Sequence, residues 1–280
     1  MSANISMRDA LYEAPGPKTQ RRVRIGTAIS LVLLVAFIAF VIRQFYINDQ
    51  LNPKYWSFFA RWTTWRFLLK GFIGTIKVAF AAGIIAMALG LLLMLGRISP
   101  NKVLSATCHV ITDLFRSLPS LLLIYFFFLV IPKYGIRMPA FWMITVPVAL
   151  AASGVLAEVF RAGVNAVPKG QVEAAMSLGM THGKITRKIV LPQALRIVIP
   201  SLVSQLVVVV KDTTVAYVVS YPDLMQNARV LISNYDALVS MYFVVALIYI
   251  AINYATNQFS VYLAERSGTQ VLSRVDENPV

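Results

Sequence analysis

Cysteine and histidine are scarce in this sequence of 280 residues. Cys108 is the single cysteine, so the chain cannot form an internal disulfide or build a cysteine metal cluster. The two histidines, His109 and His182, are far apart along the chain. Because a protein metal site needs several such ligands brought together, we predict no metal site.

Charged residues are also few. They make up 14% of the chain, against 58% hydrophobic residues, and the mean hydropathy is +0.69. A typical soluble domain has about 45–50% apolar and roughly 25% charged residues, and a soluble fold of this composition would expose large apolar patches. The composition therefore excludes a soluble cytosolic enzyme and a disordered chain, and it favours a multi-pass membrane protein.

Acidic residues are the scarcer of the two charged groups. The 12 Asp and Glu residues face 26 Lys and Arg residues, which gives a net charge of +14 and a pI of about 10.1. In a soluble protein this excess suggests nucleic acid binding, whereas in a membrane protein it reports topology and contact with anionic lipid. We therefore expect the lipid bilayer as a partner and no nucleic acid.

Six apolar runs lie between the charged clusters. A membrane-spanning helix needs about 20 apolar residues, within a range of about 17–25. The candidates are residues 25–42, 78–95 with a helix start near Gly71, 117–132, 138–157, 197–210 with a continuation to Val219, and 237–264. The runs at 117–132 and 197–210 are short, so each is either a span or a re-entrant or buried core helix.

The flanking segments define a topology. We predict a cytoplasmic tail at residues 1–24, an uncleaved N-terminal anchor helix at 25–42, an outer interfacial segment at 43–70 and a second cytoplasmic tail at 267–280. A cleaved signal peptide is the alternative for the first run, but no A-x-A site follows it. Lys and Arg are more numerous on the side that holds both tails, which the positive-inside rule assigns to the cytoplasm. The segment 43–70 is basic and rich in Trp, as in an amphipathic helix at the membrane interface.

The loop after the fourth run, residues 167–193, is long and patterned. A proline and a glycine break the preceding helix, and apolar residues at helical spacing predict a short helix with Glu173 in its first turn. Gly179 permits a tight turn. A second, basic helix is expected over residues 184–190 and should stop at Pro192. From the pattern alone, this hairpin is either a docking surface for a soluble partner or a connector that lies on the membrane.

The spacing within this loop carries a family resemblance. The pattern E-A-A, three residues, Gly, nine residues, Ile, one residue, Leu-Pro is met by Glu173, Ala174, Ala175, Gly179, Ile189, Leu191 and Pro192. This resembles the EAA loop of the membrane subunits of bacterial ABC importers.

Further elements resemble the polar-amino-acid permease branch, and the similarity covers about residues 71–266. They are a helix opening with Gly71, Gly74 and Thr75, F-R-x-x-P at Phe115, Arg116 and Pro119, A-E-x-x-R-[AG]-G from Ala157 to Gly163, V-P-x-G-Q from Val167 to Gln171, and L-P-Q-A-x-R with K-D-T between Leu191 and Thr213. There are three departures. Ser204 or Gln205 stands where Asn is common, Val155-Leu156 replaces Ala-Tyr, and many relatives lack a segment before Gly71.

The resemblance implies an all-α polytopic membrane protein with the type I ABC importer transmembrane-domain fold: one anchor helix plus a five-helix permease core at residues 71–266. It implies a bacterial inner membrane location, a cytoplasmic ATPase dimer that docks on the EAA loop, a second permease subunit and an extracytoplasmic solute-binding protein. We favour a heterodimer, with a homodimer as the alternative. By the same resemblance the substrate is a polar amino acid such as glutamate or glutamine.

The chain itself has no G-x-x-x-x-G-K-[ST] nucleotide motif, because in the segment from Gly179 to Thr186 the gap before the Gly-Lys pair is wrong and Ile185 follows the Lys. We therefore expect no cofactor in this chain and no enzymatic activity of its own, with ATP and Mg²⁺ held by the partner ATPase. An intramembrane enzyme would need a motif such as H-E-x-x-H, which is absent. An ion-coupled secondary transporter or a channel is the remaining alternative.

Polar residues within the fifth run are the candidates for the substrate pathway, because ionisable groups inside a helix bundle are costly and usually functional. The candidates are Ser204, Gln205, Lys211, Asp212, Thr213 and Thr214. The alternatives are that Lys211 snorkels to the interface, that Asp212 caps a local break, and that the polar residues bond between helices. Glu158 and Arg161, one helical turn apart, are expected to form an intrahelical ion pair rather than to bind substrate.

Overall fold

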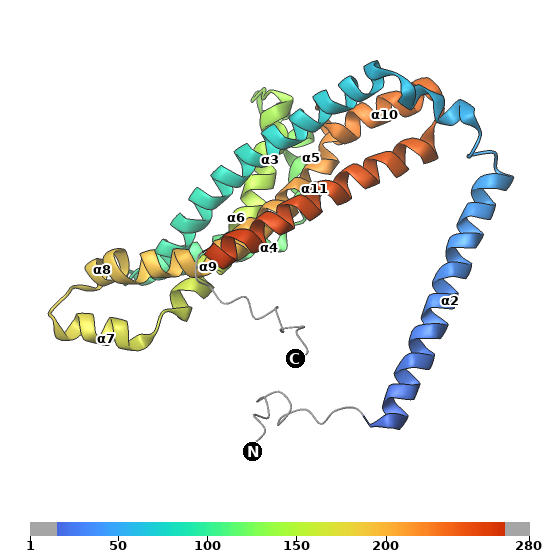
Figure 1. The fold of residues 1–280 in the computed structure, drawn as a ribbon. Coiled ribbons are helices and arrows are strands. Elements are labelled where there is room, and N and C mark those ends of the chain that lie inside the picture. Colours follow the sequence, from blue (N-terminus) through green and yellow to red (C-terminus); the bar gives the residue numbers. More distant parts are fainter. Residues whose placement is uncertain (1–15, 267–280) are drawn as a thin grey trace. The chain divides into compact units, whose positions relative to one another are not determined.

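The computed structural model describes residues 16–266, and within that range every regular element is a helix (Figure 1). The predicted tail at 267–280 and most of residues 1–24 lie outside the described residues. The chain divides into two units, residues 1–57 and residues 58–280. Within residues 16–266, five helices are long and apolar enough to cross a membrane, or six if one bent pair counts as a span, in agreement with the six predicted runs.

The first unit is dominated by helix α2, Pro17–Ile47. Pro17 lies at the first helical position, where its fixed φ and missing N–H cause no loss. The helix has 31 residues, about 46 Å at 1.5 Å per residue, which exceeds the roughly 30 Å hydrocarbon core of a bilayer. None of its residues is buried. The predicted anchor at 25–42 therefore forms the middle of a longer helix, whose basic first turns extend beyond the apolar run.

The predicted interfacial segment at 43–70 is not one element. It contains the end of α2, two short 3₁₀ turns, η1 (Pro53–Tyr55) and η2 (Ser57–Ala60), and the first turns of α3 (Trp62–Arg97). The long helix of the second span thus begins at Trp62, well before Gly71. Since α3 has 36 residues, or a length of about 54 Å, it is longer than the hydrocarbon core of a bilayer, and its first turns can extend beyond that core.

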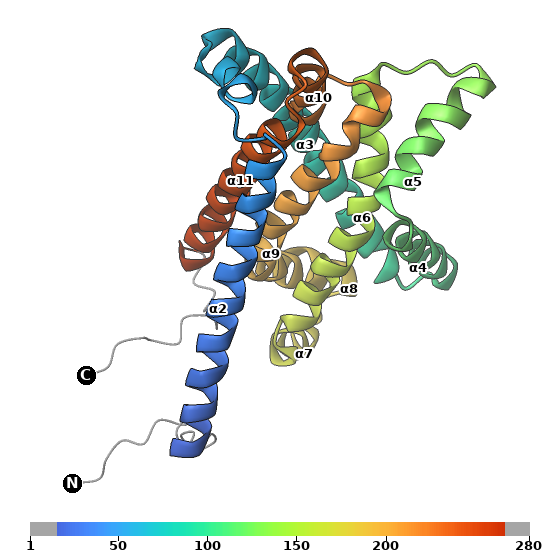
Figure 2. The same ribbon diagram turned by 90° about the vertical axis from the view of Figure 1, so that its right-hand side faces the viewer.

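The third predicted run forms the second arm of a bent pair. Helix α4 (Lys102–Ser117) and the segment α5 (Ser120–Tyr125), η3 (Phe126–Val130) and η4 (Ile131–Tyr134) meet at 96° (Figure 2). The bend occurs because Leu118, which precedes Pro119, is extended, as the ring of a following proline requires. This geometry belongs to a broken span or a re-entrant loop. Helix α4 itself was not predicted because Lys102, Asp113 and Arg116 keep its sequence from forming a long apolar run.

Helix α6 (Ala140–Ala166) packs along α3 through small residues. A Cβ on Gly90 of α3 would lie 2.9 Å from the Cβ of Leu156, and one on Gly154 would lie 2.7 Å from the backbone nitrogen of Arg116. Helix association in membranes depends on such close backbone approach. The glycines therefore bring α3, α4 and α6 together at one end of the second unit.

The patterned loop folds as α7 (Lys169–Ser177), α8 (His182–Ile185) and η5 (Thr186–Val190), followed by α9 (Leu191–Asp212) and η6 (Thr213–Val219). The prediction that the second helix stops at Pro192 is wrong, because His182–Val219 forms one helical span of 38 residues. The π turn explains this: the N–H of Leu191 bonds the carbonyl of Thr186, five residues back. Pro192, which has no N–H, enters the helix just after this turn, where the four-residue register is already interrupted.

Helix α10 (Leu224–Tyr235), which precedes α11 (Leu238–Arg266), was not predicted. Its N-cap is Asp223, a fully buried residue whose Oδ1 accepts from the N–H of Gln226 at 2.7 Å. Thr75 of α3 accepts from the N–H of Leu224 at 3.1 Å, and a Cβ on Gly71 would lie 2.6 Å from the carbonyl oxygen of Asp223. The glycine and threonine residues of α3 noted in the sequence, Gly71 and Thr75, therefore form the surface against which the start of α10 packs.

The carboxyl group of Asp223 is only partly satisfied. Its Oδ2 is buried and has no hydrogen-bond partner among the described residues. Along the sequence, Asp223 lies outside the membrane spans, after the one that ends at Val219 and before the one that begins at Leu238. Burial raises its pKa from the usual 3.8 to about 6.

Candidate functional site

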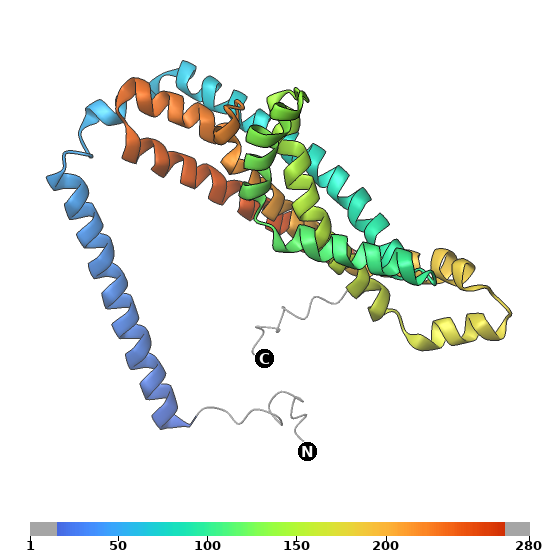
Figure 3. The same ribbon diagram turned by 180° about the vertical axis from the view of Figure 1, so that it is seen from behind.

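The helical hairpin α7–α8 projects from one end of the second unit (Figure 3). Its turn is a Schellman motif: the N–H of Met180 bonds the carbonyl of Ala175 at 3.1 Å, and the N–H of Gly179 bonds that of Met176 at 2.9 Å. Gly179 has φ +72°, the left-handed conformation that glycine adopts without a Cβ penalty. The predicted turn at Gly179 is confirmed, and its backbone conformation explains the residue type.

A small apolar core holds the hairpin to the following span. It consists of the buried residues Val167, Ala175, Ile185, Val190 and Ala194. The second alanine of the E-A-A element is therefore structural, since Ala175 is 2% exposed and supports the surface rather than forming it. Through this core the hairpin packs directly against the first turn of α9.

The remaining residues of the EAA pattern define the outer surface. Glu173, Ala174, Gly179 and Pro192 are exposed, while Ile189 and Leu191 are half-buried. Two further apolar side chains lie on the same hairpin: Leu178 is 82% exposed and Met176 is 45% exposed. Met176 is one of the apolar residues at helical spacing from which the short helix was predicted, whereas Leu178, directly before Gly179 at the turn, was missed. The exposed apolar tip, with Lys184, Arg187 and Lys188 beside it, is suited to a protein partner rather than to water.

A polar crevice lies where α4, α5, α6 and α9 meet. It has a volume of about 150 Å³, and its polar lining residues are Arg116, Ser120, Gln205 and Asp212. The side chain of Ser120 lies beside the carboxylate of Asp212 in this lining. Phe115, Val155 and Val208 are among the apolar residues that complete the wall. The crevice therefore presents one guanidinium, one carboxylate, one amide and one hydroxyl within an otherwise apolar surround.

The structure brings two of the six pathway candidates, Gln205 and Asp212, into this crevice. Ser204 and Lys211 are exposed outside it. Thr213 is buried and donates to the carbonyl of Val210 at 2.8 Å, and Thr214 is half-buried. Asp212 makes no capping bond to the following 3₁₀ helix, so the capping alternative is not supported. Arg116 and Ser120 were not proposed as pathway residues, although Arg116 stands in the quoted F-R-x-x-P element.

An ion network joins the crevice to the hairpin end of the bundle. Glu158 of α6 contacts Arg161 at 2.9 Å, so the predicted intrahelical pair is confirmed, but it also contacts Arg97 at 2.6 Å and Arg116 at 3.4 Å. The side chain of Arg97 is only 6% exposed. One carboxylate therefore holds three helices, α3, α4 and α6, and one of its arginines also lines the crevice.

The network continues through a histidine. Arg97 Nη2 donates to His109 Nδ1 at 2.8 Å, and His109 Nε2 lies 3.3 Å from Asp113 Oδ2. The described residues contain no group of three or more His, Cys, Asp or Glu side chains placed to hold a metal ion. The arrangement is thus a structural ion network that fixes the position of Arg116.

A helical hairpin with an exposed apolar tip on a bundle of apolar spans suggests a transport subunit, and the comparison with known families is decisive. Residues 86–268 match the family described as binding-protein-dependent transport system inner membrane component. The chain belongs to this family. It is therefore a multi-pass transport permease, and its family works with a binding protein.

Individual relatives agree with this assignment. The chain is 33% identical over 241 residues to the glutamate transport system permease protein GluD of Corynebacterium glutamicum, which covers 83% of this chain and 88% of that protein. It is 36% identical over 193 residues to the probable glutamine ABC transporter permease protein GlnP of Bacillus subtilis, covering 68% and 88%.

Solved structures show the same permease fold. A crystal structure of an amino acid ABC transporter with histidines matches with a TM-score of 0.70 at 28% identity, covering 75% of this chain and 98% of that one. An inward-facing structure of the MetNI methionine ABC transporter matches with a TM-score of 0.62 at 21% identity, covering 74% and 99%, and supports the fold alone. The predicted fold class is confirmed.

Proposed function

We propose that this permease forms the membrane-spanning pathway of an ATP-driven uptake system for a polar amino acid such as glutamate or glutamine. The observation that carries the proposal is the α7–α8 hairpin, with its ordered turn, its core against α9 and its exposed apolar tip. A cytoplasmic ATPase dimer grips this hairpin, and ATP and Mg²⁺ belong to that partner. The names of the relatives in Corynebacterium glutamicum and Bacillus subtilis support the substrate class.

The coupling route follows from helix continuity. Residues His182–Val219 form one helical span, so the same continuous helical element carries the hairpin at one end and both Gln205 and Asp212 farther along. When the ATPase pair closes and displaces the hairpin, α9 moves with it. The crevice changes shape because the opposite wall, on α4 and α6, is held separately by Glu158 and its arginines.

The crevice matches the chemistry of an amino acid zwitterion. The guanidinium of Arg116 suits a carboxylate, since planar N–H pairs match carboxylate geometry. The carboxylate of Asp212 suits an ammonium group, and the amide of Gln205 suits either a side-chain carboxylate or an amide. An acidic or amide amino acid therefore finds a partner for each of its polar groups within this one crevice.

The assembly proposed around the chain has a second permease subunit, preferably a sister chain in a heterodimer, and an extracytoplasmic solute-binding protein that delivers the amino acid. Both tails face the cytoplasm, and the membrane is the bacterial inner membrane. The excess of Lys and Arg near the hairpin supports this orientation.

Reconstitution tests the proposal. The chain is co-purified with the ATPase and the second permease subunit, placed in proteoliposomes with the binding protein, and assayed with labelled glutamate and glutamine. We expect uptake that needs ATP and the ATPase subunit, and that stops with a non-hydrolysable ATP analogue. Uptake by this chain alone, driven by an ion gradient, would show instead a secondary transporter or a channel.

The crevice is tested separately. Arg116→Gln and Asp212→Asn should each raise the KM for uptake about tenfold or more, because each removes a charge-assisted hydrogen bond worth roughly 1.5–3 kcal/mol. Lys211→Gln, one residue away and outside the crevice, is the matched control and should leave KM nearly unchanged. Equal effects of all three substitutions would contradict the assignment of this crevice to the substrate.

A further inference from the structure

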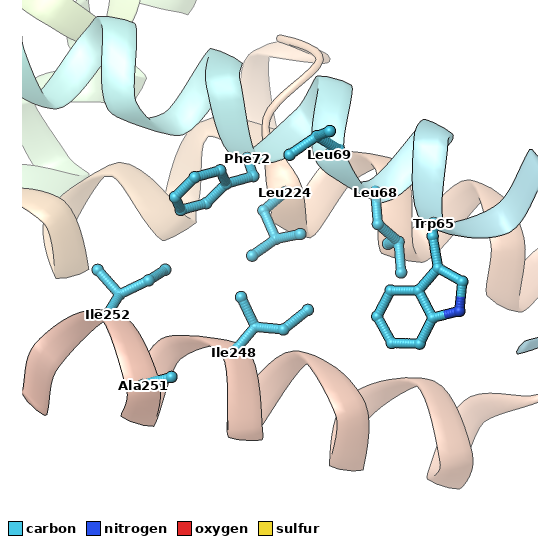
Figure 4. A pocket seen from close by; sticks show the side chains of 8 residues that line it. All are labelled: Trp65, Leu68, Leu69, Phe72, Leu224, Ile248, Ala251 and Ile252. Atoms are coloured by element: carbon cyan, nitrogen blue, oxygen red, sulfur yellow. The ribbon is translucent and has the colours of Figure 1, made fainter. Parts of the chain in front are cut away.

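An apolar crevice opens between α3 and α11, with α10 behind it (Figure 4). Its volume is about 280 Å³, and its walls include Trp65, Leu68, Phe72, Leu224, Ile248 and Ile252. The one polar atom among the lining side chains is the indole nitrogen of Trp65, which already donates to the carbonyl of Phe59 at 2.7 Å. Water in the crevice would therefore find no side-chain partner, and the site calls for an apolar occupant.

The crevice faces the membrane rather than the interior of the bundle. Leu69 of α3, which also lines the crevice, is 50% exposed, and Leu247 of α11, one helical turn before the lining residue Ala251, is 49% exposed. Such side chains are stable only against hydrocarbon or another apolar surface. An occupant can thus enter sideways from the bilayer.

Cations gather beside Trp65 at one end of the crevice, at the N-cap and in the first turns of α3. They are Arg61, Arg66 and Lys70, all exposed, and the guanidinium of Arg61 lies 6.0 Å from the ring centroid of Tyr235. No Asp or Glu occurs between Asp49 and Asp113 in the sequence. The ion pairs of the described residues include none of these three cations. Their positive charge is therefore not neutralised by the protein.

The height of these groups along α3 suits the boundary between hydrocarbon and headgroups. Trp62 and Trp65 are 72% and 41% exposed at the start of a helix longer than the hydrocarbon core. Exposed Trp residues favour this boundary. Arg66 and Lys70 each follow a crevice-lining residue by one position, so they lie about 100° around the helix and flank the mouth with side chains long enough to snorkel.

We propose that this crevice is a binding site for an anionic phospholipid. One acyl chain lies between α3 and α11 against Phe72, Ile248 and Ile252. The phosphate-containing headgroup contacts the cations at the start of α3, and the Trp rings lie at the level of the ester groups. The proposal depends only on the membrane location of the chain, not on which amino acid it transports.

Lipid retention by the full permease complex tests the proposal. The complex is purified, exchanged into detergent with equimolar phosphatidylglycerol and phosphatidylcholine, and examined by native mass spectrometry. We expect one tightly retained phosphatidylglycerol for each copy of this chain. Ala251→Trp fills the crevice and should lower that occupancy at least tenfold, whereas Ala246→Trp, on an exposed part of the same helix away from the crevice, should not.

The headgroup contacts are tested by charge removal. A basic residue near an anionic surface contributes about fivefold in affinity, so Arg66→Gln with Lys70→Gln should reduce the preference for phosphatidylglycerol over phosphatidylcholine by about 25-fold. Lys133→Gln with Arg137→Gln, which removes the same charge elsewhere, should leave the preference intact.

Three results would overturn the proposal. Retained lipid in Ala251→Trp at the wild-type level would show ordinary annular lipid. Equal retention of both lipids by the wild-type chain would show that the cations do not select a headgroup. Efficient disulfide cross-linking of Ile248→Cys to a cysteine placed on a partner helix would show that a protein segment, not a lipid, fills the crevice.

Discussion

The turn of the hairpin at Gly179 offers the sharpest test of the coupling surface. Gly179→Ala places a Cβ on a residue with φ +72°, yet no heavy atom lies within 4 Å of that Cβ. The substitution therefore adds backbone strain without a clash. The left-handed conformation costs an L-residue roughly 1–2 kcal/mol, which shifts the equilibrium between the ordered and opened turn by about 5- to 30-fold.

Two assays measure this effect. In hydrogen exchange, the amides of Gly179 and Met180, which close the Schellman motif, should exchange about 5- to 30-fold faster in Gly179→Ala. In detergent-solubilised complexes, the affinity for the ATPase should fall by a similar factor, because part of the binding free energy is then used to order the turn. Gly179→Asn should lie between wild type and Ala, since Asn tolerates this conformation better.

The matched control is Gly183→Ala, four residues away in α8. A Cβ at Gly183 also has no heavy atom within 4 Å, and no positive φ is present there. Ala in a helix is as good as Gly or better by up to about 1 kcal/mol, so this variant should keep both exchange rates and ATPase affinity. Equal losses in Gly179→Ala and Gly183→Ala, or no loss in either, would refute the argument that the turn conformation sets the docking surface.

Three further perturbations test the rest of the structure. Gly179→Asp and Glu173→Lys should leave the chain in the membrane but release the ATPase in co-purification, and retained association with normal uptake in both would count against docking on this hairpin. Glu158→Gln should destabilise the protein by about 3 kcal/mol, because it leaves the nearly buried Arg97 guanidinium without its carboxylate. Arg161→Gln should cost less than about 1 kcal/mol, because the Arg161 side chain is 45% exposed. Equal thermal unfolding temperatures for the two variants would contradict the ion network. Burial raises the pKa of Asp223 to about 6, so between pH 3.8 and 6 the folded state binds more protons than the unfolded state. The contribution of the Asp223 carboxyl group to stability is therefore complete below pH 3.8 and is lost as the pH rises through about 6. Melting temperatures measured from pH 4 to pH 8 should show this decline in the wild type and a smaller one in Asp223→Asn, and identical profiles would rule it out.

The sequence determined features that depend on local chemistry. Apolar runs between charges located the spans because the cost of a charge in hydrocarbon is paid wherever the residue occurs. The turn at Gly179 followed from the freedom of glycine, and the EAA spacing gave the family. The pair Glu158–Arg161 was predictable for the same reason, since three residues separate neighbours on one helix face.

Tertiary structure decided what depends on contacts between distant segments. The partners Arg97 and Arg116 reach Glu158 only because Gly90 and Gly154 let α3 and α4 approach α6. The residue pattern of a single helix does not reveal which other helices pack against it. The helix continues through Pro192 because a π turn directly before it has already interrupted the regular hydrogen-bond register, so the N–H that proline lacks is not needed there. The seat of α10 on Gly71 and Thr75, and the crevices that hold Asp212 and the proposed lipid, likewise exist only where separate helices converge. Side-chain type fixes the cost of burying a group, but the packing of helices decides which groups are buried together.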